Sequence, residues 1–307
     1  MSTPLWQPSS EGKESTLLTH FSKIIQAKYD LPNSKYSTIH KWSIDNPGLF
    51  WVEVWKDCKV IASKSWSKVM GKDLFNVKND SERSGWFEGA RLNYAENLLI
   101  RNNDENEALN FVAENGKKHS FSYAELKSSV SQCAAGMKEM GISEMDRVAA
   151  VIPNCPEAVI GLLAVSSIGA IWSSCSPDFG IKGIHDRLGQ ISPKILITVN
   201  AYHYNGKEYD CLTKIREVAK LIPSIEAVYV IQFTETEIQF KGKEKPWTEL
   251  LDYSANTTIF AQLPFDHPLY ILYSSGTTGL PKSIVHGAGG CLLKHLTEHR
   301  YHSDINS

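Results

Sequence analysis

The sequence lacks several features that would assign a class of protein at once. Its 32 Lys or Arg and 34 Asp or Glu among 307 residues give a formal net charge of −2, so no excess of charge indicates nucleic acid or an anionic membrane as partner. The most apolar stretch, 158–172, is shorter than the roughly 20 residues of a membrane-spanning helix. The polar N-terminus disfavours a secretory signal. We expect a globular cytoplasmic (cytosolic) protein without a membrane span.

The cysteines also lack a pattern that would assign a site. None of the six falls in a C-x-x-C pair, and several lie among apolar residues, so we expect free, buried thiols in a reducing compartment. The segment HLTEH, from His295 to His299, matches the H-x-x-E-H order of some zinc peptidases. No third ligand is evident in the sequence, so we predict no metal site.

From about residue 108, stretches typical of strands and helices alternate. The predicted strands are continuous apolar runs, which favours an α/β fold with a mainly parallel sheet flanked by helices. Ser122 and Glu125 have the spacing of a capping box at the start of a helix that Gly141 ends, and Pro156 opens another. The other predicted elements are strands at 147–153, 170–174, 194–198, 227–233 and 268–275, and helices at 184–191 and 211–222.

The N-terminal part has a different composition. Six of the eight tryptophans precede residue 91, which indicates an aromatic-rich segment packed on a larger domain. Asn93 and Glu96 have the spacing of a helix N-cap and its third residue. We predict a first segment at 1–105 and a larger domain that begins at 106 and continues to 307. Within it, 234–267 is predicted to be a long connection with a short helix near Trp247.

The segment YSSGTTGLPKS, 273–283, has the composition of an anion-binding loop. Its hydroxyls and backbone N–H groups are donors, its glycines let the backbone approach an anion, and its lysine adds a positive charge. Two residues separate the second glycine from the lysine, so the loop is not a Walker A motif, and it does not fit the G-x-G-x-x-G fingerprint. The residues predicted to bind the phosphates of a nucleotide are Ser274, Ser275, Gly276, Thr277, Thr278, Gly279 and Lys282.

This loop resembles the signature of the adenylate-forming superfamily, which includes acyl-CoA synthetases, luciferases and nonribosomal peptide adenylation domains. WFEGARLNYAENLL, 86–99, resembles the N-terminal segment of the acetyl-CoA synthetase branch. IGAIWSSCSPDFG, 168–180, and YNGKE, 204–208, resemble the acetoacetate-activating members of that branch. The resemblance runs, with gaps, from about Trp42 to the end of the chain.

The resemblance implies an acid–thiol ligase that uses ATP, Mg²⁺ and coenzyme A. Acetoacetate would attack the α-phosphate of ATP to give an acyl-adenylate and pyrophosphate, and coenzyme A would then displace AMP. The loop would hold the β- and γ-phosphates, and His286 would lie near the nucleotide or acyl site. The residues implied to contact coenzyme A are Tyr204, Asn205, Gly206 and Lys207. A solvated loop position for Lys207 and a packing role for His286 remain open alternatives.

Members of the family continue well beyond the position of Ser307. The resemblance implies a later adenine and ribose pocket, a Thr-Glu element near Mg²⁺ and a small C-terminal domain with a lysine that supports adenylation; the sequence shows no counterpart of these. We therefore expect an incomplete adenylate-forming N-terminal domain with little activity alone, and we assign no catalytic residue. The alternative is a non-catalytic nucleotide-binding or interaction module, and an exposed edge of such a fragment would favour non-native association.

Overall fold

A computed structural model describes residues 5–71, 85–100, 104–254, 260–274 and 279–305. The chain divides into two compact units. The first contains Met1–Ala90 and Gly289–Ser307, and the second contains Arg91–Ala288. The predicted division at residue 105 and the packing of the aromatic segment on the larger domain stay predictions.

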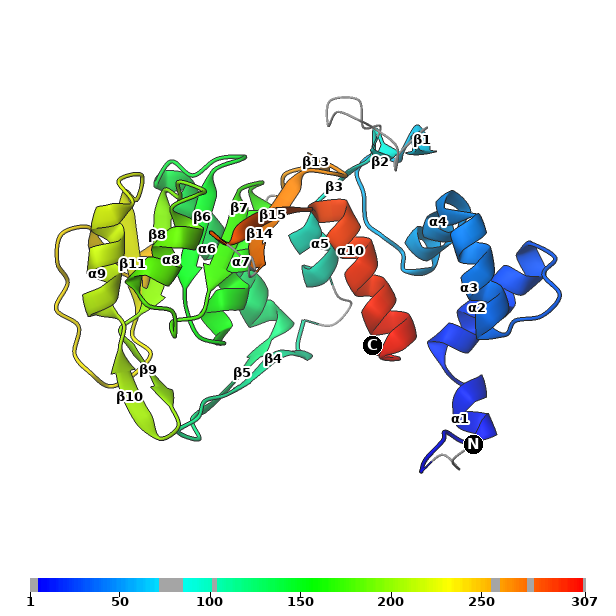
Figure 1. Cartoon of the computed structure of the whole chain (residues 1–307), viewed down its shortest axis with the longest axis horizontal. Coiled ribbons are helices and arrows are strands. Elements are labelled where there is room, and N and C mark those ends of the chain that lie inside the picture. The colour runs from blue at the N-terminus through cyan, green and yellow to red at the C-terminus, as the bar shows by residue number, and fades with distance from the viewer. Residues whose placement is uncertain (1–4, 72–84, 101–103, 255–259, 275–278, 306–307) are drawn as a thin grey trace. The chain divides into compact units, whose positions relative to one another are not determined.

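A seven-stranded sheet forms the centre of the second unit (Figure 1), in the order β12-β11-β8-β6-β7-β14-β15. Every neighbouring pair is parallel except β14 and β15. This arrangement confirms the predicted α/β fold with a mainly parallel sheet. The strands are β6 (Arg147–Val151), β7 (Ile171–Cys175), β8 (Ile195–Val199), β11 (Ala227–Ile231), β12 (Glu244–Pro246), β14 (Pro268–Ser274) and β15 (Lys282–Gly287).

Capping residues mark the start of helices in this unit. The Glu125 N–H donates to the Ser122 hydroxyl at 3.2 Å and the Ser122 N–H to the Glu125 carboxylate at 2.7 Å, which confirms the capping box. The Asn93 side chain accepts a hydrogen bond from the Glu96 N–H at 3.2 Å and caps α5, as predicted. The helices are α5 (Tyr94–Leu99), α6 (Tyr123–Glu139), α7 (Pro156–Ser167), α8 (Ile181–Leu188), α9 (Leu212–Leu221) and the 3₁₀ helix η2 (Trp247–Leu250).

The two faces of the sheet are covered by different helices. Ile184 of α8 and Ile215 of α9 belong to one buried cluster with strand residues such as Ala149 and Leu196. On the opposite face, a Cβ added to Gly161 of α7 would lie 2.9 Å from the Trp172 ring, so α7 is pressed against β7. The chain therefore crosses from β6 to β7 on one face and returns past β6 to β8 on the other.

Three small antiparallel ladders complete the second unit. They are β4 (Glu107–Val112) with β5 (Lys118–Ser122), β9 (Ala201–Tyr204) with β10 (Lys207–Asp210), and β3 (Arg91–Leu92) with β13 (Leu263–Pro264). The predicted connection at 234–267 does contain a short helix at Trp247. It also contains β12, which extends the parallel sheet by one strand, and β13; neither strand was predicted from the sequence.

The first unit is mainly helical. The rings of Trp55, Trp66 and Phe87 lie 4.9 to 5.1 Å apart, so these aromatic residues form a packed core. The Tyr301 hydroxyl donates to Asp57 Oδ2 at 2.6 Å and ties residue 301 to α4. The elements are α1 (Ser10–Glu14), α2 (Leu17–Lys28), α3 (Tyr36–Asp45), α4 (Pro47–Asp57), β1 (Lys68–Met70), β2 (Trp86–Glu88), α10 (Ala288–Thr297, whose first residue ends the second unit) and the π-helix η3 (Glu298–His302).

Within the described ranges, no helix has both the length and the apolar character needed to cross a membrane. All six cysteines are free thiols. Cys133, Cys155, Cys211 and Cys291 are buried, as predicted, whereas Cys58 and Cys175 are only half-buried.

Candidate functional site

The carboxyl ends of the parallel strands meet at one edge of the sheet. The order of the strands reverses at β6, since β7 lies on one side of it and β8 on the other. In open α/β sheets, ligands bind in the crevice outside the strand ends at such a reversal. Two groups of predicted site residues follow strands at this edge: Ser274 ends β14, and the β9–β10 hairpin follows β8.

The hydroxyl-rich loop is the connection of an antiparallel hairpin. Ser274 at the end of β14 lies directly opposite Lys282 at the start of β15. This register sets the first hydroxyl and the lysine of the predicted phosphate site on the two sides of one loop mouth. Ser274 is half-buried and the Lys282 side chain is exposed. The predicted Ser275, Gly276, Thr277 and Thr278 lie outside the described residues.

Both strands at the loop mouth are held by side chains from other elements. On the β14 side, the fully buried hydroxyl of Ser173 donates to the Ile271 carbonyl at 2.8 Å. On the β15 side, Gln190, two residues after α8, accepts a hydrogen bond from the Ser283 hydroxyl at 2.9 Å and donates to the Pro281 carbonyl at 2.9 Å. Neither Ser173 nor Gln190 could be predicted from the sequence, because neither belongs to a recognisable motif.

Two further predicted residues lie on this hairpin. Gly279 is exposed, and an added Cβ would meet no atom within 4 Å. His286 pairs with Tyr270, and their ring centroids are 5.0 Å apart. His286 shares a face of β15 with Lys282 but lies four residues along, about 13 Å away at the rise of a strand. The ring contact favours packing as the role of His286.

The residues predicted to contact coenzyme A form a tight hairpin rather than an irregular loop. Tyr204 pairs with Lys207 across a two-residue turn. Asn205 has φ of 50° and Gly206 has φ of 72°, the left-handed values that a type I′ turn requires at both central positions. All four residues are exposed. The Gly206 N–H donates to Glu114 Oε1 at 3.0 Å, so this tip lies beside the tip of the β4–β5 hairpin (Figure 1). Lys207 is therefore a strand residue, which corrects its interpretation as a loop lysine.

Asn200, between β8 and β9, holds the base of this hairpin. It is buried, and its amide nitrogen donates to the Thr234 carbonyl, the Thr234 hydroxyl and the Thr236 carbonyl at 3.2, 3.1 and 2.8 Å. Its amide oxygen accepts from the N–H groups of Phe233 and Thr234 at 2.9 and 3.1 Å. One side chain thus fixes the segment that follows β11.

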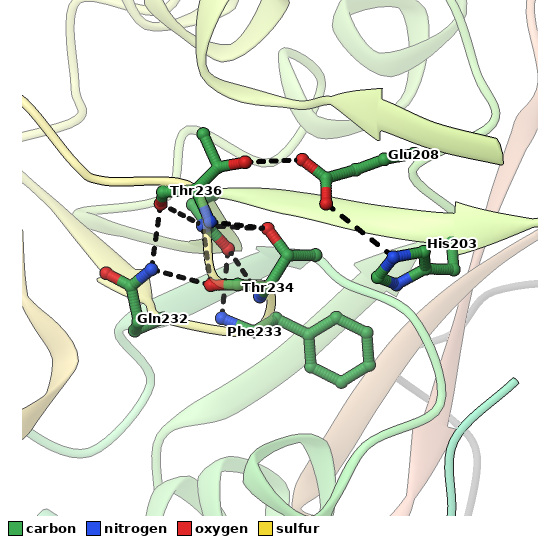
Figure 2. Close-up of polar contacts among 7 residues, drawn as sticks. His203, Glu208, Gln232, Phe233, Thr234 and Thr236 are labelled. Carbon is green, nitrogen blue, oxygen red and sulfur yellow. Dashed lines mark hydrogen bonds and ion pairs between the residues drawn. The ribbon is translucent and has the colours of Figure 1, made fainter. Parts of the chain in front are cut away.

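A surface layer of polar contacts continues from that segment to the hairpin (Figure 2). Gln232 donates to the Thr234 and Thr236 carbonyls at 2.6 and 2.8 Å. The Thr236 hydroxyl donates to Glu208 of β10 at 2.5 Å, and Glu208 lies 3.6 Å from His203 of β9. These contacts link β9, β10 and the end of β11 at the carboxyl edge.

Hydrogen bonds to the Asp178 carboxylate hold the other side of the hairpin base. The Tyr202 hydroxyl donates to Asp178 Oδ1 at 2.6 Å, and the Ser176 hydroxyl donates to Asp178 Oδ2 at 2.8 Å. The hydrogen bond from Tyr202, followed by that from Ser176, lowers the pKa of Asp178 below its ordinary value. Asp178 is therefore an ionised acceptor at neutral pH.

The nearby thiols are not nucleophiles. Burial raises the pKa of Cys175, at the end of β7, to about 12, and burial raises the pKa of Cys211, at the foot of β10, to about 12. A thiol with such a pKa carries almost no thiolate at neutral pH. Covalent catalysis by either cysteine is therefore disfavoured.

The two candidate groups lie apart along the sheet. β6 and β7 separate β8, which leads into the hairpin, from β14, which leads into the loop. Three interstrand spacings of about 4.8 Å put these strands about 14 Å apart. A ligand that used both groups would need either two separate parts or a long flexible arm.

A cavity of about 230 Å³ lies between the β4–β5 hairpin and the start of α7. Its lining includes Lys117, Glu157 and His203, so its charges are mixed. It contains none of the predicted phosphate or coenzyme A residues. Among the residues that the structure describes, no three His, Cys, Asp or Glu side chains are grouped to hold a metal ion.

The comparison with family models decides the affiliation of the chain. Residues 100–304 match the model of the AMP-binding enzyme family. The chain belongs to the AMP-binding enzyme family. Residues 36–98 match the model described as the acetyl-coenzyme A synthetase N-terminus. Both assignments agree with the segments on which the resemblance rested.

Similar proteins are named as synthetases of acyl-coenzyme A compounds. The chain is 41% identical to an acetoacetyl-coenzyme A synthetase of Rhizobium meliloti over 98% of its own length and 46% of the relative. It is 39% identical to a malonamoyl-CoA synthetase of Penicillium aethiopicum over 98% of the chain and 43% of that protein. A solved acetoacetyl-CoA synthetase from Streptomyces lividans superposes with a TM-score of 0.90 at 35% identity, covering 99% of this chain and 46% of that one. The chain spans about half the length of these relatives.

Proposed function

We propose that this chain supplies the phosphate-binding and coenzyme A-binding part of an AMP-forming acid–thiol ligase that converts acetoacetate to acetoacetyl-CoA. In the first half-reaction a carboxylate oxygen of acetoacetate bonds to the α-phosphorus of ATP, and the bond to pyrophosphate breaks. In the second, the thiol of coenzyme A attacks the acyl carbon and AMP departs. Six free thiols suit the cytosol as the setting.

The observation that carries this proposal is the Ser274–Lys282 pair at the mouth of the hydroxyl-rich loop. The β- and γ-phosphates gain negative charge as pyrophosphate departs, and fixed hydroxyl, amide and ammonium donors stabilise that charge. Each charge-assisted hydrogen bond contributes about 1.5–3 kcal/mol. Lys282 would supply the positive charge, and Ser274 with residues 275–279 would supply the neutral donors.

Coenzyme A accounts for the second candidate group. Tyr204 and Lys207 are exposed on a hairpin about three strand spacings from the loop. A ligand whose nucleotide end rests on this hairpin reaches the reaction centre only with a long arm, which coenzyme A possesses. Lys207 would pair with a phosphate of the nucleotide end, and Tyr204 would offer a flat surface to its base.

The acyl substrate is proposed from the relatives. Acetoacetate and malonamate, which the names of two relatives imply, are short carboxylates with a second carbonyl two carbons from the acid. We propose that this shared β-carbonyl is what the acyl site recognises. Acetate lacks it, and should be the poorer substrate.

Direct binding tests the proposal on the chain as it stands. Titration calorimetry should detect ATP and coenzyme A binding, and Lys282→Ala should weaken ATP binding by about tenfold or more while coenzyme A binding is kept. Lys207→Ala should have the opposite selectivity. We expect little ATP–pyrophosphate exchange with acetoacetate, because the chain spans less than half of each relative. Equal ATP affinity in the wild type and Lys282→Ala would refute the phosphate assignment.

A second, non-catalytic function is favoured by one observation. Leu272 of β14 and Ile284 and Val285 of β15 are 42%, 44% and 56% exposed. Exposed apolar side chains on the last two strands of a sheet favour association with another chain. Concentration-dependent dimerisation in sedimentation, lost in Ile284→Lys with Val285→Lys, would support an interaction module.

A further inference from the structure

Gln190 occupies a special place beside the phosphate loop. It lies two residues beyond the end of α8, and 91 positions before Pro281, whose carbonyl it contacts. Its amide nitrogen donates to the Pro281 carbonyl at 2.9 Å and to the Asp186 carbonyl at 2.5 Å. Its amide oxygen accepts from the Ser283 hydroxyl at 2.9 Å. Both donor hydrogens and the acceptor of one side chain are therefore in use.

These bonds fix the orientation of the amide. Two of its partners, at Asp186 and Pro281, are carbonyl oxygens that only accept. A flipped amide would set its own oxygen against both of them. The nitrogen must therefore face the carbonyls, and the oxygen is left for the Ser283 hydroxyl.

The contacts bracket Lys282. Pro281 and Ser283 are its two chain neighbours, and both are bonded to the same glutamine. Ser283 also pairs with Tyr273 in the β14–β15 ladder, and Lys282 pairs with Ser274. The Pro281 backbone and the Ser283 side chain, on the two sides of the lysine, are thus tied to the segment that follows α8, while the lysine side chain itself stays exposed.

We propose that Gln190 is a positioning residue for the phosphate loop: it holds the backbone of Lys282 so that the ammonium faces the β- and γ-phosphates of ATP. This inference rests on the proposed function. A long lysine side chain on an unfixed backbone loses conformational entropy when it binds a phosphate, and a fixed backbone reduces that loss. Gln190 touches no substrate atom and acts only through the loop.

Binding of inorganic pyrophosphate to this chain tests the inference. Gln190→Met keeps the length of the side chain but removes all three hydrogen bonds, and should weaken pyrophosphate binding about fivefold, the scale of about one neutral hydrogen bond. Binding of coenzyme A should be unchanged, since its hairpin follows β8. Ser283→Ala removes one of the three bonds, should weaken pyrophosphate binding about twofold, and serves if Gln190→Met does not fold.

Gln232→Met is the matched control. Gln232 is an exposed glutamine that also donates to two carbonyls, but it lies next to the coenzyme A hairpin. Its substitution should leave pyrophosphate binding unchanged. Equal weakening in Gln190→Met and Gln232→Met, or equal weakening of coenzyme A and pyrophosphate binding in Gln190→Met, would overturn the inference, because the effect would then be general loosening.

Lys282→Ala separates the two levels of the argument. If Lys282→Ala weakens pyrophosphate binding and Gln190→Met does not, the positioning role is wrong and the phosphate assignment stands. If Lys282→Ala itself has no effect, the phosphate assignment fails and the role of Gln190 fails with it. Weakening by both substitutions, the larger by Lys282→Ala, is the expected result.

Discussion

The two hairpins that carry the candidate site are built in opposite ways. The β9–β10 hairpin turns in two residues, Asn205 and Gly206, both with positive φ. The β14–β15 hairpin closes at Ser274 and Lys282, which seven residues separate. The first turn is dictated by its own backbone. The second is held by side chains of other elements that contact its two strands.

The side chains that hold the two hairpins in place differ as well. The base of the β9–β10 hairpin depends on one buried side chain, that of Asn200, which makes five hydrogen bonds to residues 233–236. The β14–β15 hairpin is held by two residues from other elements. The buried Ser173 contacts β14, and the exposed Gln190 contacts the chain at the start of β15. A single substitution should therefore damage the first hairpin more than the second, and the following predictions test this difference.

The largest effect is expected for Asn200→Ala. It leaves the N–H groups of Phe233 and Thr234 without their partner in a buried position, so the free energy of unfolding should fall by about 3 kcal/mol. Urea denaturation followed by circular dichroism measures this loss. Gln232→Ala, which removes exposed bonds to the same segment, should cost less than about 1 kcal/mol. The comparison fails if the two substitutions cost the same.

The next effect is expected for Ser173→Ala. The lost bond to the Ile271 carbonyl is buried, so the free energy of unfolding should fall by about 1–2 kcal/mol, with weaker pyrophosphate binding. Ser167→Ala is the control: it is as fully buried, but its hydroxyl bonds only to Ala164 of its own helix. That substitution should be close to neutral. A loss in Ser167→Ala as large as that in Ser173→Ala would show that the strand contact is not special.

Part of the fold could be predicted from the sequence, because the signals for it are local. The capping box at Ser122, Pro156 at the start of α7 and the apolar strand runs each act within a few residues. The hairpin at Asn205–Gly206 has a local signal too, but its flanking residues do not alternate between apolar and polar, so it was not predicted. Strand β15 was not predicted because it is largely exposed.

The supports of the loop could not be predicted at all. Ser173 contacts a residue 98 positions away and Gln190 one 91 positions away. Serine and glutamine are common residues with no positional preference that would mark these contacts. Only the order of the strands, in which β14 returns beside β7, brings Ser173 to its partner. Motif residues indicate a site in the sequence, whereas the residues that hold the site in place are brought there by the order of the strands.

The third prediction concerns the glycines of the two hairpins. Gly206→Ala places a side chain at φ of 72°, so it should lower the free energy of unfolding by about 1 kcal/mol. A Cβ added at Gly279 would meet no atom within 4 Å, so Gly279→Ala should change stability by less than about 0.5 kcal/mol. If Gly279 lets the backbone approach the bound phosphate, Gly279→Ala should nevertheless weaken pyrophosphate binding. Destabilisation by Gly279→Ala equal to that by Gly206→Ala would erase the distinction.

The smallest effect concerns pH at the base of the β9–β10 hairpin. Because the hydrogen bond from Tyr202 and then that from Ser176 lower the pKa of Asp178, its contribution to stability is present above the unfolded pKa of about 3.9. It is lost as the pH falls through the lower, folded pKa. Asp178 is exposed, so the contribution should be only about 0.3 kcal/mol. Urea unfolding at pH 7 and at pH 3 measures the difference.

Many carboxylates titrate over that interval, so the informative quantity is the difference between variants. Tyr202→Phe removes the donor to Asp178 and should reduce the acid loss of stability relative to the wild type. Tyr209→Phe keeps the ring that stacks on Tyr202 at 5.6 Å and leaves the Asp178 contact in place, so its pH dependence should match the wild type. An unchanged acid loss in Tyr202→Phe would mean that Asp178 is held by Ser176 alone, and that the hairpin base depends on Asn200 without help from this side.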